Sequence, residues 1–214
     1  MAMKSFIILL CFIISLTGCT KSKRITADDV REQVLAVGNI NSPQRSKQWQ
    51  ELAKTSPDAS EQLLARVMYV QSLICDTTPN LNAGEYRKGI RKEILSIIED
   101  APDSWQTQMA WLLLFDTFNS WEEPNEMIEM ANQALQRAKI DILNNPQEPR
   151  LQAFLEAGKY ETTDYRDFFL LFRAYSFVQL KNQEAAQKDL LEIKSEAYRK
   201  IITDFMEFRG KLKR

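Results

Sequence analysis

Apolar side chains recur every three to four residues along most of this chain, and this spacing restricts the fold more than any other feature. Val30, Val34 and Val37 follow it in one segment. Residues so spaced lie on one face of an α-helix and form a stripe that packs against a core. No segment alternates apolar and polar residues over the length of a strand. The sequence therefore predicts an all-α protein.

Turn residues indicate where the helices begin and end. Ser42-Pro43 and Ser56-Pro57 each place a capping residue before a proline, which is tolerated at the first helical position. Ala110–Phe115 is apolar on all sides, which indicates a helix buried on more than one side. Residues 147–163 are the least defined, with a short helix expected around 151–156. We expect the other helices near 26–37, 42–53, 56–74, 84–98, 103–115, 121–143, 164–180, 183–194 and 198–208.

The N-terminal segment has the composition of a secretory leader. Lys4 precedes a run from Phe6 to Leu16 in which Ser15 is the only polar residue. This run is too short to cross a bilayer, which takes about 20 apolar residues. A short apolar run after a basic start is typical of a signal peptide.

The run ends in Leu16-Thr17-Gly18-Cys19, which resembles the lipobox of bacterial lipoproteins. The resemblance implies cleavage before Cys19 and a lipid anchor on its sulfur, with acyl chains such as palmitate. It also implies a cell-envelope protein, and Thr20 after the cysteine suggests sorting to the outer membrane, facing the periplasm. An ordinary signal peptide with an incidental cysteine is the alternative. We expect a signal peptide (1–18), a lipidated polar tether (19–26) and a single all-α domain (27–214).

The tether carries three basic residues, Lys21, Lys23 and Arg24. They are suited to anionic headgroups near a membrane surface, but a merely solvated linker explains them equally well. Thr26 and Asp29 form a capping-box pattern, with Asp where Glu or Gln is usual, which indicates the start of the first helix.

Charge and cysteine content exclude several classes of protein. The whole chain has 28 basic and 29 acidic residues, and loss of the leader removes only one of them, the basic Lys4. The remaining charge is close to balance, so a nucleic-acid binder, which normally carries a basic excess, is not expected. Cys11 lies in the leader and Cys19 is the proposed lipid site, which leaves Cys75 as the remaining thiol. Cys75 is expected to be a small buried apolar residue. If Cys19 were not acylated, a Cys19–Cys75 disulfide would compete with this interpretation.

The chain has no histidine and no glycine-rich phosphate loop, so common catalytic triads, zinc sites and nucleotide sites are not expected. We therefore expect no catalytic residues, no cofactor and no metal, and we do not expect an enzyme. Three pairs of carboxylates remain as candidates for acid–base chemistry, and each lies near a helix start, where acidic residues stabilise the helix dipole. The pairs are Asp100 with Asp103, Glu122 with Glu123, and Glu126 with Glu129.

The segment from Leu170 onward resembles a tetratricopeptide repeat. Ala174 and Ala186 stand where two helices approach closely, and Leu180–Ala186 stands at the turn of the repeat. Arg173 departs from the Leu that the family prefers, and Tyr198 departs from its terminal Pro. A weaker unit resembles the family around Gly84-Glu-Tyr and Asp100-Ala-Pro, with wider spacing of small residues. The resemblance implies stacked antiparallel helix hairpins, with an irregular α-helical bundle as the alternative.

The two resemblances together suggest a membrane-anchored protein-interaction scaffold or adaptor whose partners are proteins. A permanent structural or accessory subunit of a larger envelope assembly is the second hypothesis, and a small-ligand-binding or degenerate enzyme domain is the third. Tetratricopeptide-type arrays bind peptides or helices in a groove. The aromatic candidates for such a surface are Trp49, Trp105, Trp111, Trp121, Tyr86, Tyr160 and Tyr165. Of these, Trp105 and Trp111 are expected to belong to the core, and Trp121, at a turn beside two glutamates and a proline, is expected to be exposed.

Overall fold

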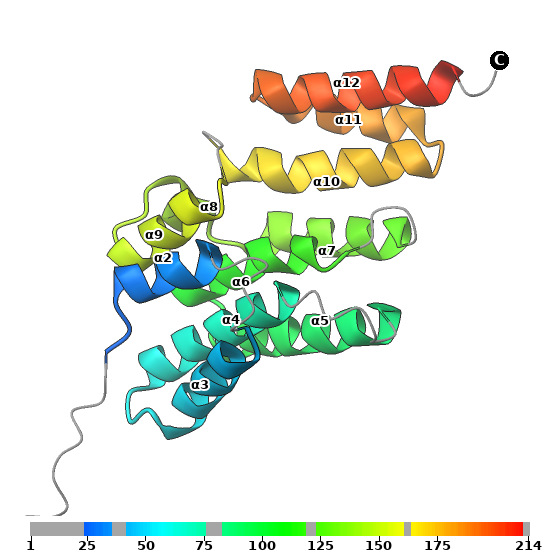
Figure 1. Ribbon diagram of the computed structural model, residues 1–214. Coiled ribbons are helices and arrows are strands. Elements are labelled where there is room, and N and C mark those ends of the chain that lie inside the picture. The colour runs from blue at the N-terminus through cyan, green and yellow to red at the C-terminus, as the bar shows by residue number, and fades with distance from the viewer. Residues whose placement is uncertain (1–23, 36–41, 76–82, 119–122, 161–163, 212–214) are drawn as a thin grey trace, which may run out of the picture.

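The computed structural model describes residues 24–35, 42–75, 83–118, 123–160 and 164–211, and all regular structure in these ranges is helical. The prediction of an all-α protein is therefore confirmed for the described part of the chain. The helices, labelled in Figure 1, are α2 (Ala27–Leu35), α3 (Ser42–Thr55), α4 (Ala59–Ile74), α5 (Ala83–Asp100), α6 (Trp105–Asp116), α7 (Pro124–Arg137), α8 (Ile140–Asn144), α9 (Pro149–Ala157), α10 (Tyr165–Gln179), α11 (Gln183–Glu192) and α12 (Glu196–Lys211).

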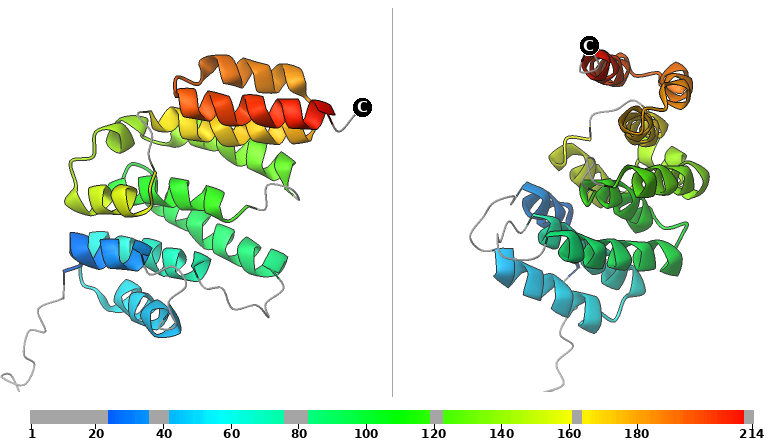
Figure 2. Two further views of the ribbon diagram at one scale, coloured as in Figure 1. Left: turned by 45° about the horizontal axis from the view of Figure 1, so that its top comes forward. Right: turned by 90° about the vertical axis from the view of Figure 1, so that its right-hand side faces the viewer.

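The helices are stacked in order, from α3 at one end of the molecule to α12 at the other (Figure 1). Helix α3 packs against α4, α5 packs against α6, and α10 packs against α7, α11 and α12. Helix α2 packs against α9 and α4, so the start of the described chain contacts its middle. Two further views agree that α10–α12 form the end opposite α3 (Figure 2).

Side-chain caps account for several helix starts. Thr26 and Asp29 form the predicted capping box: Thr26 N donates to Asp29 Oδ2 at 2.9 Å, and Asp29 N donates to Thr26 Oγ1 at 3.1 Å. Helix α3 begins at Ser42 as predicted. Helix α4, however, begins after Asp58 and not at Ser56-Pro57, because the Asp58 carboxylate accepts from the N–H groups of Ser60 and Glu61.

The long helix predicted for residues 121–143 is wrong, because the chain breaks after Arg137 into α7 and α8. Ala138 adopts an extended conformation, with φ −66° and ψ 140°. The Lys139 N–H donates to Oε1 of Gln108, a fully buried side chain on α6, at 2.8 Å. This hydrogen bond replaces an intrahelical one, which explains the break. The short helix expected around 151–156 is confirmed as α9.

Most of the buried apolar residues form one cluster, the main core, which runs from Ile25 to Phe169. Helix α6 lies at its centre, and all residues from Gln106 to Phe115 are buried, as its apolar composition predicts. Phe115 contacts the rings of Phe168, Phe169 and Phe172, with centroid distances of 5.9, 5.5 and 5.0 Å. These aromatic contacts attach the first half of α10 to the main core.

A second, smaller cluster lies between α10, α11 and α12, and we call it the C-terminal core. Its fully covered members are Ala174, Val178, Ala186 and Ile202. Arg173, which departs from the repeat pattern, donates to both carboxylate oxygens of Asp189 at 2.8 and 2.6 Å. It therefore links α10 to α11 by charge where the family pattern has an apolar residue.

Among the helices that the structure describes, none combines the length and the apolar character that a bilayer-spanning helix requires.

Candidate functional site

The proposed lipid site, Cys19, lies outside the described residues, as do Trp121 and Glu122. Cys75, at the C-terminal end of α4, is half-buried, and Gln71 Nε2 lies 3.3 Å from its sulfur. Burial raises the pKa of the Cys75 thiol, which favours the unreactive protonated form. The expectation of a packed thiol agrees with this environment, although the side chain is not fully buried.

The paired carboxylates do not converge on a catalytic centre in the described part of the chain. Asp100 pairs with Arg66 at 2.6 Å, and Asp103 pairs with Lys139 at 2.9 Å. Glu123 instead accepts two hydrogen bonds from Arg91, at 2.6 and 2.7 Å. These contacts join neighbouring helices, so the carboxylates act in packing. No group of three or more metal-ligating side chains is found among the described residues.

The aromatic candidates do not share one surface. Trp111 and Tyr165 belong to the main core, with exposed fractions of 0% and 5%. Trp49 is half-buried, and its Nε1 donates to Gln33 Oε1 at 2.7 Å. Tyr86 donates to the Leu73 carbonyl at 3.1 Å. The described aromatic candidates therefore do not form one groove, and the expectation that Trp111 lies in the core is confirmed.

Asp116 and Tyr160 form a polar contact at the edge of the main core. The Tyr160 hydroxyl donates to Asp116 Oδ2 at 2.8 Å, and its ring stacks on Phe154. Desolvation raises the pKa of Asp116 to about 6, while the hydrogen bond from Tyr160 opposes this shift. Asp116 keeps an exposed surface, so water moderates the effect. Neither residue lines the groove between α5 and α7 that is described below.

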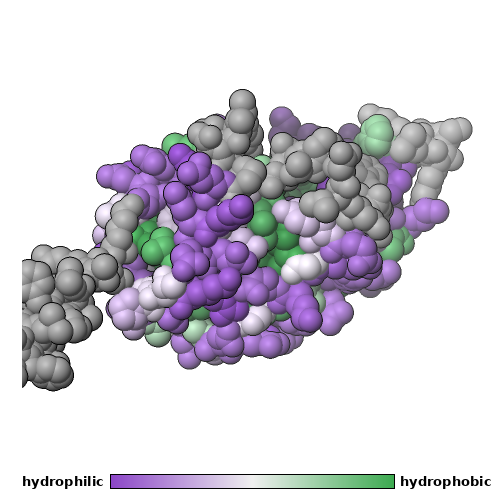
Figure 3. Space-filling model, turned by 60° about the horizontal axis from the view of Figure 1, so that its bottom comes forward, coloured by the Kyte–Doolittle hydropathy of each residue, from purple (hydrophilic) through white to green (hydrophobic). Residues whose placement is uncertain are grey.

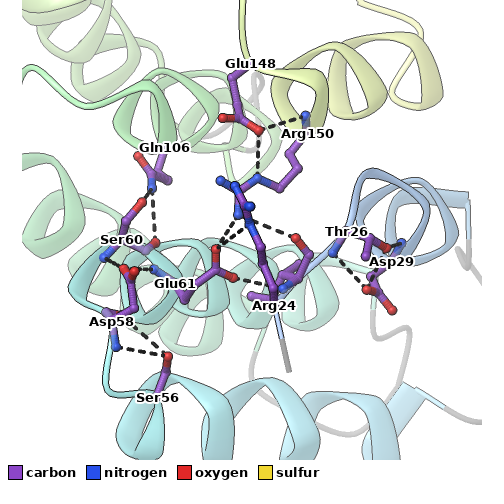
Figure 4. A network of polar contacts seen from close by, with 11 residues as sticks. Arg24, Thr26, Asp29, Ser56, Asp58, Ser60, Glu61, Gln106, Glu148 and Arg150 are labelled. Carbon is purple, nitrogen blue, oxygen red and sulfur yellow. Dashed lines mark hydrogen bonds and ion pairs between the residues drawn. The ribbon is translucent and has the colours of Figure 1, made fainter. Parts of the chain in front are cut away.

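A buried charged network surrounds the first described residues (Figure 4). Arg150 on α9 contacts Glu61 on α4 through Nη1 and Oε1 at 2.5 Å, and their side chains are 8% and 9% exposed. Arg150 Nε also donates to Glu148 Oε1 at 2.7 Å, and its guanidinium lies 4.9 Å from the Trp105 ring centroid. Trp105 therefore packs beneath an internal ion pair rather than lining a partner surface.

The network holds the backbone of Ile25. The Ile25 N–H donates to Glu61 Oε2 at 2.9 Å, and Arg150 Nη1 donates to the Ile25 carbonyl at 3.4 Å. Burial lowers the pKa of Arg150, but its hydrogen bonds to Glu148 and Glu61 outweigh burial and raise it. The hydrogen bond from Arg150 lowers the pKa of Glu148. Arg150 therefore stays charged around neutral pH, and together with Glu61 it fixes residue 25 to the fold.

An open groove of about 660 Å³ lies between α5 and α7. Exposed Lys88 and Lys92 stand on the α5 side, and exposed Glu126 and Glu129 stand on the α7 side. Half-buried apolar side chains lie between them. The complete lining is Lys88, Arg91, Lys92, Leu95, Ser96, Glu99, Phe118, Glu126, Glu129 and Met130. The groove thus has an apolar floor, with Lys88, Lys92 and the acidic Glu99 on its α5 wall and the acidic Glu126 and Glu129 on its α7 wall.

Arg91 closes one part of this groove from within. The periodicity of α5 places it on the outer face, yet it is only 6% exposed. Its two hydrogen bonds to Glu123 raise the pKa of Arg91, and its guanidinium lies 4.6 Å from the Phe118 ring centroid. Glu123 is 32 residues away from Arg91 in sequence, so the helical spacing of apolar residues could not predict this contact.

A second exposed surface lies on the C-terminal helices. Leu191, Phe208 and Ile201 are 79%, 53% and 49% exposed. Four of the five large exposed apolar residues among the described ones belong to residues 180–208, and the fifth is Leu35 on α2. Large exposed apolar side chains that gather in one region are typical of interaction surfaces.

No known protein family, curated protein or solved structure matches this chain.

Proposed function

We propose that the chain is a lipid-anchored lipoprotein of the bacterial cell envelope that serves as a protein-interaction scaffold. The lipobox-like Leu16–Cys19 supports the anchor, and the all-α architecture with an open groove between α5 and α7 supports a binding role. Thr20 favours the outer membrane in an organism with two membranes. In this proposal the anchor supplies location and the helical domain supplies the binding surface.

We further propose that the domain is a short tetratricopeptide-like array. The arrangement of α10, α11 and α12 supports this, because α10 packs against both following helices. Ala174 and Ala186 are fully buried in this part of the molecule, where close helix approach requires small side chains. The inserted helices α8 and α9, and the packing of α2 on α9, set this chain apart from a regular array.

The groove between α5 and α7 is the observation that carries the proposal. Lys88 and Lys92 are four residues apart and face the same side of α5. No ion pair of either lysine is found among the described residues, so both are available to a partner. We propose that the groove binds an amphipathic helix with acidic residues on one flank and basic residues on the other. Its apolar stripe would cover Leu95, Phe118 and Met130.

Site-specific photocrosslinking in cells tests the location of binding. A photoreactive residue at Lys92, in the groove, is expected to crosslink a defined protein. The same residue at Lys188, an exposed lysine on α11, is the matched control and is expected to give little of that product. Equal crosslinking from both positions would contradict the groove as the binding site.

A charge swap tests the chemistry of binding. Lys88→Glu together with Lys92→Glu is expected to weaken the complex with the crosslinked protein. Reversal of acidic residues on the bound flank of the partner is expected to restore it. Loss without restoration, or no loss, would count against the proposed charge complementarity.

The anchor needs its own test. The intact mass of the wild type is expected to equal that of a chain that begins at Cys19 and carries added acyl groups. The protein is also expected to fractionate with membranes. Cys19→Ser should lose both properties. An unmodified Cys19 in the wild type would remove the anchor from the proposal.

The exposed apolar residues of α11 and α12 favour a second candidate function, a permanent subunit of a larger envelope assembly. Leu191 is 79% exposed, and an obligate interface would cover such a residue. In that case a photoreactive residue at Phe208 should crosslink one partner quantitatively. The isolated chain should then aggregate at concentrations where the complex stays soluble.

A further inference from the structure

The chain becomes part of the fold only a few residues after the proposed lipid site. Ile25 is 4% exposed, and its N–H and carbonyl groups bond to Glu61 and Arg150. The capping box of Thr26 and Asp29 follows directly and starts α2. Residues 24–26, which the sequence suggested as the end of the tether, therefore contact the domain.

The attachment of Ile25 to Glu61 and Arg150 is buried, since all three residues are less than 10% exposed. Glu61 on α4 accepts from the Ile25 N–H and Arg150 on α9 donates to the Ile25 carbonyl, so two helices far apart in sequence hold the backbone of one residue. Releasing Ile25 would leave these buried charges with unfilled hydrogen-bonding positions, which is unfavourable in a low-dielectric interior. The usable tether therefore ends before Ile25.

The remaining tether is short compared with the domain. Five residue steps separate Cys19 from Arg24, and a fully extended chain spans at most about 3.3–3.6 Å per residue, or roughly 18 Å. A compact domain of this length has a diameter of roughly 40 Å from its expected radius of gyration. A tether that reaches less than half of the diameter does not allow the domain to turn its far end to the membrane.

We infer that the side of the domain that carries α2 is held against the lipid headgroups, whereas α11 and α12 point away from the membrane. The inference rests on the proposed lipid anchor at Cys19. In Figures 1 and 2, α11 and α12 lie at the opposite end of the stack from α3, and α2 lies between these ends, packed against α9 and α4. The exposed apolar residues of α11 and α12 thus face the aqueous compartment, where a protein is within reach.

The bilayer-facing side is suited to headgroups and not to insertion. Hydrophilic residues cover most of the neighbouring lower face of the molecule, with smaller hydrophobic areas between them (Figure 3). Arg31 on α2 is engaged with Asp28 and Glu156, at 2.8 and 3.4 Å. These local pairs leave little basic excess on α2, so tether length and not a basic patch sets the orientation.

Fluorescence quenching by labelled headgroups tests the orientation of the full lipidated protein in vesicles. In a Cys75→Ser background, Glu32→Cys places a fluorophore on α2, and Glu184→Cys places one on α11; both glutamates are exposed. Glu32 lies six residues after Thr26, so the helical rise separates them by only about 10 Å. The label at residue 32 is expected to lose most of its fluorescence to a headgroup quencher, while the label at residue 184 keeps most of its own.

Lengthening the tether provides the matched control. About 20 Gly/Ser residues inserted between Lys23 and Arg24 add a mean reach of roughly 25 Å, so the contrast between the two labels should shrink. Equal quenching at both positions with the native tether, in protein that floats with the vesicles, would overturn the orientation while leaving the anchor intact. Protein that does not float would overturn the anchor and this inference together.

Discussion

The main core and the C-terminal core differ in the number and size of the side chains that they bury. The main core buries Trp111, Phe115, Phe154 and Phe169 at exposed fractions of 2% or less. The C-terminal core has two alanines, one valine and one isoleucine as its fully covered members. Because apolar burial stabilises in proportion to area, the two parts of one chain should differ in local stability.

Helix α10 belongs to both parts. Its first half contributes Phe168 and Phe169 to the main core, and its second half contributes Ala174 and Val178 to the C-terminal core. Tyr175 stacks on Phe205 with a centroid distance of 4.2 Å and adds a ring contact between α10 and α12. Helices α11 and α12 thus pack on the second half of α10, outside the main core, and the apolar side chains buried there are smaller than those of the main core.

Phe115→Ala should have the largest effect. Removal of a fully buried aromatic ring that contacts three other rings is expected to cost about 3–5 kcal/mol of unfolding free energy. Urea denaturation of the leaderless chain measures it. Phe208→Ala, at 53% exposure, is the matched control and should change stability by less than about 0.5 kcal/mol. Similar losses for the two variants would contradict the contrast between the regions.

Ala174→Leu tests the close packing of the C-terminal core. The side chain is fully buried, and the added methyl and methylene groups are expected to cost about 3 kcal/mol by overpacking. Hydrogen exchange should accelerate in α11 and α12 first, with α4 and α6 still protected. A loss below about 0.5 kcal/mol would show that no tight crossing exists at this position.

Asp167→Ala should have a smaller and more local effect. The carboxylate Oδ2 accepts from the N–H groups of Lys194 and Ser195, at 2.9 and 2.7 Å, directly before α12. Removing it leaves two donors without their acceptor, which is expected to cost about 1–3 kcal/mol. Asp167→Asn keeps an acceptor oxygen and should lose less. If exchange in residues 196–211 stayed unchanged in Asp167→Ala, this cap would not secure α12.

The smallest effect concerns pH and the main core. The pKa of Asp116 is raised to about 6 in the folded protein, so between about pH 4 and 6 the folded state holds a proton that the unfolded state releases. This group therefore makes the protein less stable as pH rises through that window. Asp116→Asn should remove that component, as denaturation at pH 4 and pH 7 would reveal. Equal pH dependence in the variant and the wild type would exclude Asp116 as its source.

Local patterns predicted the helical class, the capping box at Thr26 and the central position of α6. These features depend on residues within a few positions of one another. The break after Arg137 could not be predicted in the same way, because its cause is Gln108 on another helix. The start of α4 was misplaced for a local reason, since the side chain of Asp58, and not that of Ser56, accepts hydrogen bonds from the first N–H groups of the helix.

The candidate sites were harder to predict than the fold. Arg91 and Arg150 look like ordinary surface residues of amphipathic helices, yet both are buried by acidic partners distant in sequence. The groove between α5 and α7 combines side chains from two segments that no motif connects. The lipidation of Cys19 is supported by sequence resemblance alone and stays a prediction.

The contact between Ile25 and the Glu61–Arg150 pair also bears on how this protein can vary. Glu61 and Arg150 bind the peptide N–H and carbonyl of residue 25, which every non-proline residue possesses. The pair thus binds backbone groups and does not recognise a particular side chain at this position. Substitutions at residues 21–24 should therefore be tolerated as long as residue 25 remains apolar, so the sequence of the tether can vary while its point of attachment is preserved.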